Sequence, residues 1–211
     1  MLPHDGQPVV EAGPPLGEAR VVGILVHGRN AAPANILDLA KRFERPDITW
    51  LAPAAAGRTW YPLSFMAEIA QNEPGVSSGI GVLAALVARV ESAGVPRSRI
   101  VIGGFSQGAC LASEFAIRHA SRFGGLLVFS GGAIGEPGTT WTHPGAFDGT
   151  PAFLGCSDVD AHVPEGRVRE TAGVLDRMGA EVTLRIYPGM GHLVNEDEIE
   201  AARVILDRAR A

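Results

Sequence analysis

Ser106 stands in the sequence Gly104-Phe105-Ser106-Gln107-Gly108, between two apolar stretches. This G-x-S-x-G pattern is typical of a serine nucleophile on a sharp turn that leads from a strand into a helix. Glycines two residues to either side let the strand and the helix approach closely. A glycine-rich connection whose serine only caps the helix would share the pattern. The flanking sequences RIVIGG and ACLASEFAI favour the nucleophile, because they predict the strand and helix that the turn requires.

A serine hydroxyl is a weak nucleophile, so it needs a histidine to take its proton and an acid to orient that histidine. In hydrolases with this turn, the order along the chain is serine, acid, histidine. His192, in the sequence YPGMGH between the last predicted strand and the last predicted helix, is the candidate base. His143 precedes the candidate acids, and His119 lies within the helix that follows Ser106.

The sequence GCSDVDAHVP offers two candidate acids. Asp158 and Asp160 both follow a predicted strand and precede His192, and either could instead cap the next helix. Asp158, Asp160 and His162 also alternate along the chain, a spacing that could suit a divalent cation. No HxxxH or CxxC partner accompanies them, so no metal site is expected. From the residues alone, the choice between the two aspartates stays open.

An oxyanion hole would complete such a site. One donor is expected to be the backbone N–H of Gln107, which follows the nucleophile. The second should come from the loop LVHGRN, where Gly28 lets the backbone approach the substrate and Arg29 offers its backbone N–H. His27 is expected to have a structural role, because it precedes the acid along the chain. This chemistry needs neither a cofactor nor a metal.

Strands and helices alternate along the whole chain. The expected strands are apolar runs at 19–28, 47–53, 98–104, 123–132, 150–156 and 181–189, with an antiparallel edge strand at 6–10. The expected helices occupy 33–43, 76–93, 107–120 and the segments that start near 164 and 195, with Asn195 as an N-cap. This alternation predicts an α/β fold whose mostly parallel sheet has helices on both faces. Active sites of such sheets lie at the carboxyl ends of the strands, where the loops of the candidate residues fall.

Composition limits the partners of the chain. Its 211 residues fit one domain over 1–211, and 46% hydrophobic residues supply a core. A net charge of -5 with scattered basic residues argues against a nucleic-acid partner. Two cysteines and an N-terminus without a signal peptide predict a cytoplasmic protein. No run approaches the roughly 18 apolar residues of a membrane span, so no stable membrane association is expected.

Four motifs stand in order along the chain: HGRN, GFSQGA, SDVDAHVP and GMGH. Together they resemble the carboxylesterase/phospholipase branch of the α/β-hydrolases, which includes acyl-protein thioesterases. The resemblance implies an α/β-hydrolase fold, with Ser106 as nucleophile and His192 as base. In that family the acid is followed, three and four residues later, by an apolar residue and a proline. The resemblance therefore selects Asp160 over Asp158.

The chain departs from this family after His-Gly. Family members usually carry a glycine and an acid there, whereas this chain has Arg29, Asn30 and Ala31. The chain is also short for the fold, with no insertion long enough for a large cap, so an open active site is expected. The resemblance allows a homodimer.

The aromatic segment GRTWYPLSFM is the candidate wall of a substrate pocket, with Trp60, Tyr61, Leu63 and Phe65 as its side chains. Ordinary core packing would explain the same residues equally well. An apolar, uncapped site suits a small-molecule ester with a short to medium acyl chain. A lysophospholipase or an acyl-thioesterase would use the same three catalytic residues. A catalytically silent hydrolase fold that binds a small molecule is the alternative from another class.

Overall fold

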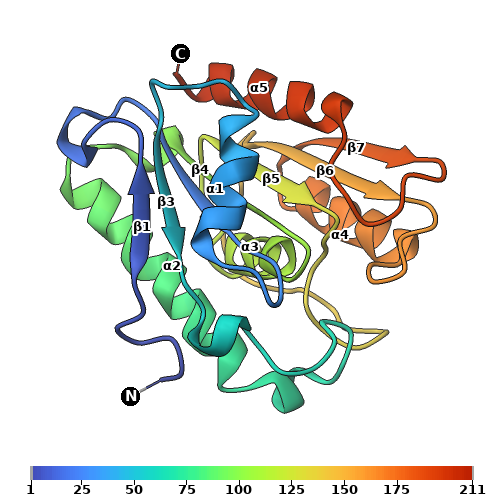
Figure 1. Cartoon of the computed structure of the whole chain (residues 1–211). Coiled ribbons are helices and arrows are strands. Elements are labelled where there is room, and N and C mark those ends of the chain that lie inside the picture. Colours follow the sequence, from blue (N-terminus) through green and yellow to red (C-terminus); the bar gives the residue numbers. More distant parts are fainter. Residues whose placement is uncertain (1, 211) are drawn as a thin grey trace.

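A seven-stranded sheet forms the centre of the molecule in a computed structural model, which describes residues 2–210 (Figure 1). Met1 and Ala211, the two ends of the predicted domain, lie outside the described residues. The strands are arranged in the order β1-β3-β2-β4-β5-β6-β7. Their bounds are β1 Val9–Ala12, β2 Val22–Val26, β3 Thr49–Pro53, β4 Ile100–Phe105, β5 Gly125–Phe129, β6 Pro151–Ser157 and β7 Glu181–Tyr187.

The sheet is parallel except at one edge. There β1 runs antiparallel to β3, with Val10 opposite Ala52. The predicted edge strand at 6–10 is thus present, but it begins at Val9. The strand predicted over 123–132 is shorter, because Ser130 has a φ of 47°, a left-handed conformation that ends β5. The mostly parallel α/β architecture agrees with the prediction.

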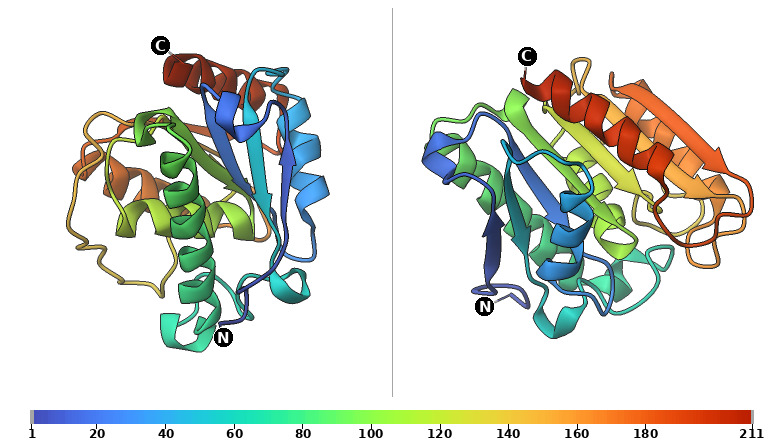
Figure 2. Two further views of the ribbon diagram at one scale, coloured as in Figure 1. Left: turned by 90° about the vertical axis from the view of Figure 1, so that its left-hand side faces the viewer. Right: turned by 45° about the horizontal axis from the view of Figure 1, so that its top comes forward.

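Helices cover both faces of the sheet, as the two views of Figure 2 show. Their bounds are α1 Pro33–Lys41, α2 Gly75–Ser92, α3 Gln107–Arg118, α4 Glu165–Arg177 and α5 Glu196–Arg210. One apolar cluster holds side chains of α1 and α5, and the other holds side chains of α2, α3 and α4. Strand β2 shows the reason: Val22 and Ile24 belong to the second cluster, while Leu25 belongs to the first. Alternate residues of a buried strand point to opposite faces, so both faces need a helical cover.

Helix α2 is the one helix within residues 2–210 whose length and composition would let it cross a membrane, so the expectation that no run approaches a membrane span is corrected for this segment. Half of its apolar window is buried inside the fold. Val76, Leu83 and Leu86 pack into the same cluster as Leu111 of α3. Core packing therefore accounts for the apolar character of α2.

Helix α5 begins with a reciprocal cap. The Asn195 Oδ1 accepts the backbone N–H of Glu198 at 2.9 Å, and the Glu198 Oε2 accepts the backbone N–H of Asn195 at 2.9 Å. Such a capping box satisfies two backbone donors that have no partner inside the helix. The predicted N-cap at Asn195 is confirmed. The cap also anchors the C-terminal side of the loop that carries His192.

Candidate active site

Ser106 occupies a strained turn between β4 and α3. Its φ of 56° and ψ of -123° are rarely adopted by a residue with a side chain. The strand and helix meet so closely that a Cβ on Gly104 would lie 2.6 Å from the Val26 carbonyl oxygen. A Cβ on Gly108 would lie 2.1 Å from the same oxygen. The two glycines of the G-x-S-x-G pattern are therefore required by packing against β2.

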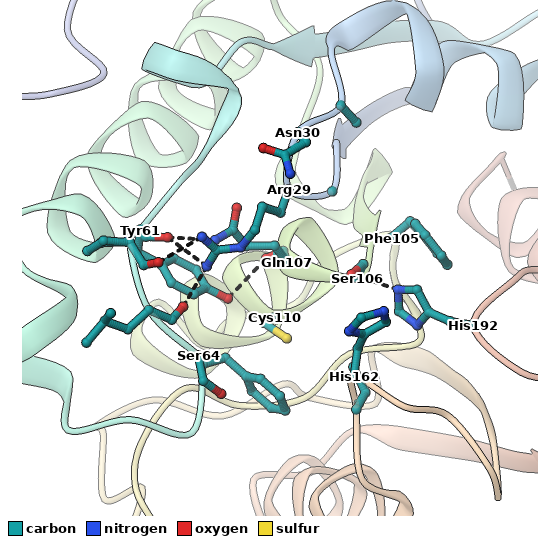
Figure 3. Close-up of a pocket in the computed structure, with 16 residues that line it drawn as sticks. Arg29, Asn30, Tyr61, Ser64, Phe105, Ser106, Gln107, Cys110, His162 and His192 are labelled. Carbon is teal, nitrogen blue, oxygen red and sulfur yellow. Dashed lines mark hydrogen bonds between the residues drawn. The ribbon is translucent and has the colours of Figure 1, made fainter.

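Three side chains from distant parts of the sequence form a hydrogen-bonded chain at the carboxyl ends of the strands. The His192 Nε2 lies 2.9 Å from the Ser106 Oγ, which follows β4 (Figure 3). The His192 Nδ1 lies 2.7 Å from the Asp160 Oδ2, which follows β6. His192 itself lies in the loop between β7 and α5. The structure thus brings together Ser106 and His192, which the sequence pattern indicated, and Asp160, which the family resemblance selected.

The Asp160 side chain is fully buried behind the imidazole. Burial by itself would raise the pKa of Asp160. The hydrogen bond from His192, and those from the backbone N–H groups of His162 and Val163 at 2.8 and 3.0 Å, outweigh burial and hold this pKa below its usual value. Asp160 is therefore a carboxylate at neutral pH.

Asp158 holds the histidine loop from outside the hydrogen-bonded chain. Its Oδ1 accepts the backbone N–H of Gly189 at 2.8 Å, and the neighbouring Ser157 Oγ accepts that of Gly191 at 3.0 Å. Asp158 is exposed, whereas Asp160 faces His192. Within the described chain, Asp158, Asp160 and His162 do not form a cluster that could hold a metal ion.

Two backbone amides stand beside the nucleophile where an oxyanion hole is expected. The Gln107 N–H opens α3, and the first N–H groups of a helix have no carbonyl partner within it. The Arg29 N–H lies in the loop after β2, next to Gly28, where an added Cβ would be 3.4 Å from the Ser106 Cβ. His27 is buried, and its Nε2 accepts the backbone N–H of Ala55 at 3.1 Å. That contact is the structural role expected of His27.

A cavity of about 590 Å³ opens beside Ser106 (Figure 3). Tyr61, Leu63 and Phe65 line it, as predicted for the aromatic segment. Trp60 does not: it is fully buried, and its indole N–H donates to the His27 carbonyl at 2.9 Å. The prediction for Trp60 is corrected, because the chain turns after it and sends its side chain into the core.

The segment that carries the pocket residues is fixed from three directions, none of which the sequence analysis anticipated. The Gln107 side chain accepts the Trp60 N–H at 3.0 Å and donates to the Tyr61 carbonyl at 2.8 Å. The buried Asn72 side chain pairs with the backbone of Leu63 and Ser64. These partners lie 8 to 47 residues apart in sequence, so no local pattern could reveal them.

The Arg29 guanidinium supplies the third anchor. It donates to the backbone carbonyls of Tyr61, Pro62 and Leu63 at 2.9, 2.8 and 2.6 Å. The sequence analysis considered only the backbone of Arg29. Its side chain joins the loop after β2 to the cavity wall, so the loop expected to hold an oxyanion donor is connected to the cavity beside Ser106.

His162 extends the polar character of the site. Its ring lies edge-on to the His192 ring, with centroids 4.8 Å apart, and it lines the cavity. Phe105 contacts the His192 ring from another direction, also at 4.8 Å. The imidazole of His192 is thus held between two neighbouring rings while it contacts Ser106 and Asp160.

Known proteins share this architecture. The phospholipase/carboxylesterase family matches residues 8–209. The crystal structure of a phospholipase/carboxylesterase from Dyadobacter fermentans superposes with a TM-score of 0.93 at 36% identity, over 98% of this chain and 99% of that one. The Bacillus cereus carboxylesterase, at 19% identity and a TM-score of 0.74, over 97% of this chain and 95% of its own, shares the fold.

Curated relatives are more distant in sequence. Acyl-protein thioesterase 1 of Yarrowia lipolytica is 28% identical over 67% of this chain, and the match spans 64% of that relative's length. The mouse lysophospholipase-like protein 1 is 24% identical over 88% of this chain and 85% of its own. The family match covers nearly the whole chain, and it agrees with the family resemblance that the four sequence motifs indicated. This chain belongs to the phospholipase/carboxylesterase family of the α/β-hydrolases.

Proposed function

We propose that this protein is a serine esterase that hydrolyses short- to medium-chain carboxylic esters through an acyl-enzyme on Ser106. The observation that carries the proposal is the continuous contact from the Ser106 Oγ through His192 to Asp160, at 2.9 and 2.7 Å. A binding protein without catalysis has no need for this relay, nor for the strained backbone of Ser106.

In the first half-reaction, the Ser106 Oγ attacks the ester carbonyl carbon while His192 accepts the serine proton at Nε2. The Asp160 carboxylate accepts the Nδ1–H, which fixes the tautomer and stabilises the imidazolium that forms. The backbone N–H groups of Gln107 and Arg29 are the proposed donors to the oxyanion. The C–O bond to the alcohol then breaks, and the imidazolium gives its proton to the leaving oxygen.

In the second half-reaction, water attacks the acyl-enzyme. His192 takes a proton from the water, and the oxyanion forms again at the same two N–H groups. The bond from the acyl carbon to the Ser106 Oγ breaks, and the serine recovers its proton from His192. The products are a carboxylic acid and an alcohol, so one water is consumed per ester.

The cavity beside Ser106 supports a preference for modest acyl groups. It combines apolar walls from Tyr61, Leu63 and Phe65 with an opening to solvent, because Pro62, Leu63 and Ser64 are exposed. The same chemistry would cleave thioesters or lysophospholipids, and the names of the yeast and mouse relatives make these the second candidate substrates. The proposed partner remains a small-molecule ester.

The decisive experiment combines covalent labelling with a chain-length series. A fluorophosphonate should label the wild type and not Ser106→Ala, because the reagent reacts with a serine whose hydroxyl is activated by a neighbouring base. Turnover of p-nitrophenyl esters from acetate to palmitate should peak at short to medium chains and fall by several orders of magnitude in Ser106→Ala. Near-normal turnover by that variant would end the proposal. A sharp preference for long-chain lysolipids or acyl-thioesters would favour the second candidates.

A cytoplasmic location stays part of the proposal. Cys110 and Cys156 are both free and buried, which suits a reducing compartment. The family resemblance is the sole support for a homodimer.

A further inference from the structure

The substrate cavity has an electrostatic character that the overall charge of the protein does not suggest. The chain carries a net charge of -5, yet no Asp or Glu stands among the described residues that line this cavity. Arg29 is the one permanently charged side chain among them. The Asp160 carboxylate lies behind His192, where it is buried and paired. The cavity therefore presents a positive charge to a substrate.

The Arg29 guanidinium is positioned before any substrate arrives. Three backbone carbonyls hold it at 2.6 to 2.9 Å, and it lies 6.0 Å from the centre of the Tyr61 ring. Carbonyls are neutral partners, and no carboxylate within residues 2–210 forms an ion pair with this guanidinium. Its Nε–H also has no acceptor in that part of the chain. A fixed guanidinium with an available donor suits a carboxylate ligand.

The direction of the chemistry determines which part of an ester meets Arg29. His192 must protonate the leaving oxygen, so the alcohol part lies on the imidazole side of Ser106. A second groove of about 480 Å³ begins there, lined by Phe105, Leu193 and Val194 among others. The acyl part points away from His192. In Figure 3 the Arg29 and Tyr61 side chains lie across Ser106 from His192, on the acyl side.

We infer that the preferred substrates are esters whose acyl chain ends in a carboxylate, the monoesters of dicarboxylic acids, and that the Arg29 side chain binds this carboxylate. This inference rests on the proposed esterase activity. The leaving alcohol occupies the groove beyond His192. Arg29 thereby has two roles, since its backbone N–H faces the oxyanion and its side chain selects the acyl group.

The test compares two p-nitrophenyl esters of equal chain length, the adipate monoester and the neutral hexanoate. In the wild type, kcat/KM for the adipate monoester should exceed that for the hexanoate, and a lower value would overturn the inference. Arg29→Gln should lower the ratio of the two values about fivefold, the upper range for one solvent-accessible charge pair. Arg29→Lys, which keeps the charge and loses the planar fork, should retain part of the preference.

The ratio of kcat/KM for the adipate monoester to that for the hexanoate distinguishes loss of carboxylate binding from general damage to the pocket. If Arg29→Gln only loosens the pocket wall, both esters lose activity equally and the ratio stays that of the wild type, which would overturn the inference. Arg177→Gln is the matched control, because it removes an exposed arginine of α4 that does not line the cavity. An equal drop of the ratio in Arg177→Gln would also overturn it, since the effect would then be one of net charge. Failure of the esterase proposal itself would appear separately, as absent fluorophosphonate labelling of Ser106.

Discussion

At the scale of single residues, two aspartates two positions apart have different tasks. Asp160 is buried, contacts the His192 Nδ1 and accepts two backbone N–H groups. Asp158 is exposed and holds the Gly189 N–H, so it acts on the position of the histidine loop. Asp160 places a negative charge beside the imidazole, whereas Asp158 only fixes the position of the loop that carries it.

Isosteric substitutions distinguish these two tasks. Asp160→Asn should lower kcat by about 10⁴-fold, because the amide favours the wrong imidazole tautomer and cannot stabilise the imidazolium. Asp158→Asn should change kcat by less than about tenfold, because the Asn Oδ1 still accepts the Gly189 N–H. Steady-state hydrolysis of p-nitrophenyl butyrate measures both. A loss in Asp158→Asn as large as that in Asp160→Asn would contradict the assignment.

At the scale of elements, three strand-to-helix connections converge at the end of the sheet where the parallel strands have their carboxyl termini. Ser106 follows β4, Asp160 follows β6 and His192 follows β7. Because parallel strands run in the same direction, their carboxyl ends lie together, and residues 32 to 86 positions apart in sequence become neighbours there. The tightest of these connections is the turn from β4 to α3, where backbone packs directly on backbone at Gly104 and Gly108.

That turn should tolerate no side chain at position 108. Gly108→Ala places a Cβ 2.1 Å from the Val26 carbonyl oxygen, and backbone cannot move aside as a side chain can. We expect a loss of about 3 kcal/mol in the free energy of unfolding, as for severe overpacking, or no folded protein. Urea denaturation followed by circular dichroism measures it.

Gly81→Ala is the control for this substitution. Gly81 lies inside α2 with open space around its Cβ position. Alanine there should stabilise the protein by about 0.5 to 1 kcal/mol through helix propensity alone. If Gly108→Ala were as stable as Gly81→Ala, the close packing of β4, α3 and β2 would not be what requires the glycine.

At the scale of the whole molecule, one buried carboxyl group makes stability depend on pH. Glu198 is fully buried at the start of α5, and its Oε1 has no hydrogen-bond partner within the described residues. Burial raises the pKa of Glu198 from 4.5 to about 7, although the Asn195 N–H and the charge of Arg42 act in the opposite direction. A carboxyl group whose pKa is higher in the folded state makes that state bind more protons than the unfolded chain.

The contribution of Glu198 to the free energy of unfolding should therefore decrease as the pH rises from about 4.5 to about 7 and stay constant above that. The expected change is about 3 kcal/mol, from 1.36 kcal/mol per pKa unit. Glu198→Gln cannot ionise but still accepts the Asn195 N–H, so the difference in stability between it and the wild type should shift in its favour across this interval. Urea denaturation of both proteins at pH 4.5, 6 and 8 measures the shift, and a difference that is independent of pH would refute it.

The amino-acid sequence by itself determined the features that depend on local order. The alternation of apolar strands and helices predicted the parallel sheet, because the spacing of apolar residues that distinguishes a strand from a helix depends only on residues close in sequence. The G-x-S-x-G turn, the position of His192 before the last helix and the cap at Asn195 followed in the same way. The order serine, acid, histidine, together with the need for the acid to follow a predicted strand, then left Asp158 and Asp160, and the family resemblance selected between them.

Only the tertiary structure decided which residues share a surface. Trp60 and Tyr61 are adjacent, aromatic and both buried in the core, yet of the two only Tyr61 also borders the cavity. The backbone direction at that loop depends on Gln107 and Arg29, which lie far away in sequence. The three carbonyl partners of the Arg29 side chain lie 32 to 34 residues away in sequence, so the residues around Arg29 could not predict its contact with the pocket wall. Local periodicity records which way a side chain faces within an element, but loops are oriented by contacts that only folding creates.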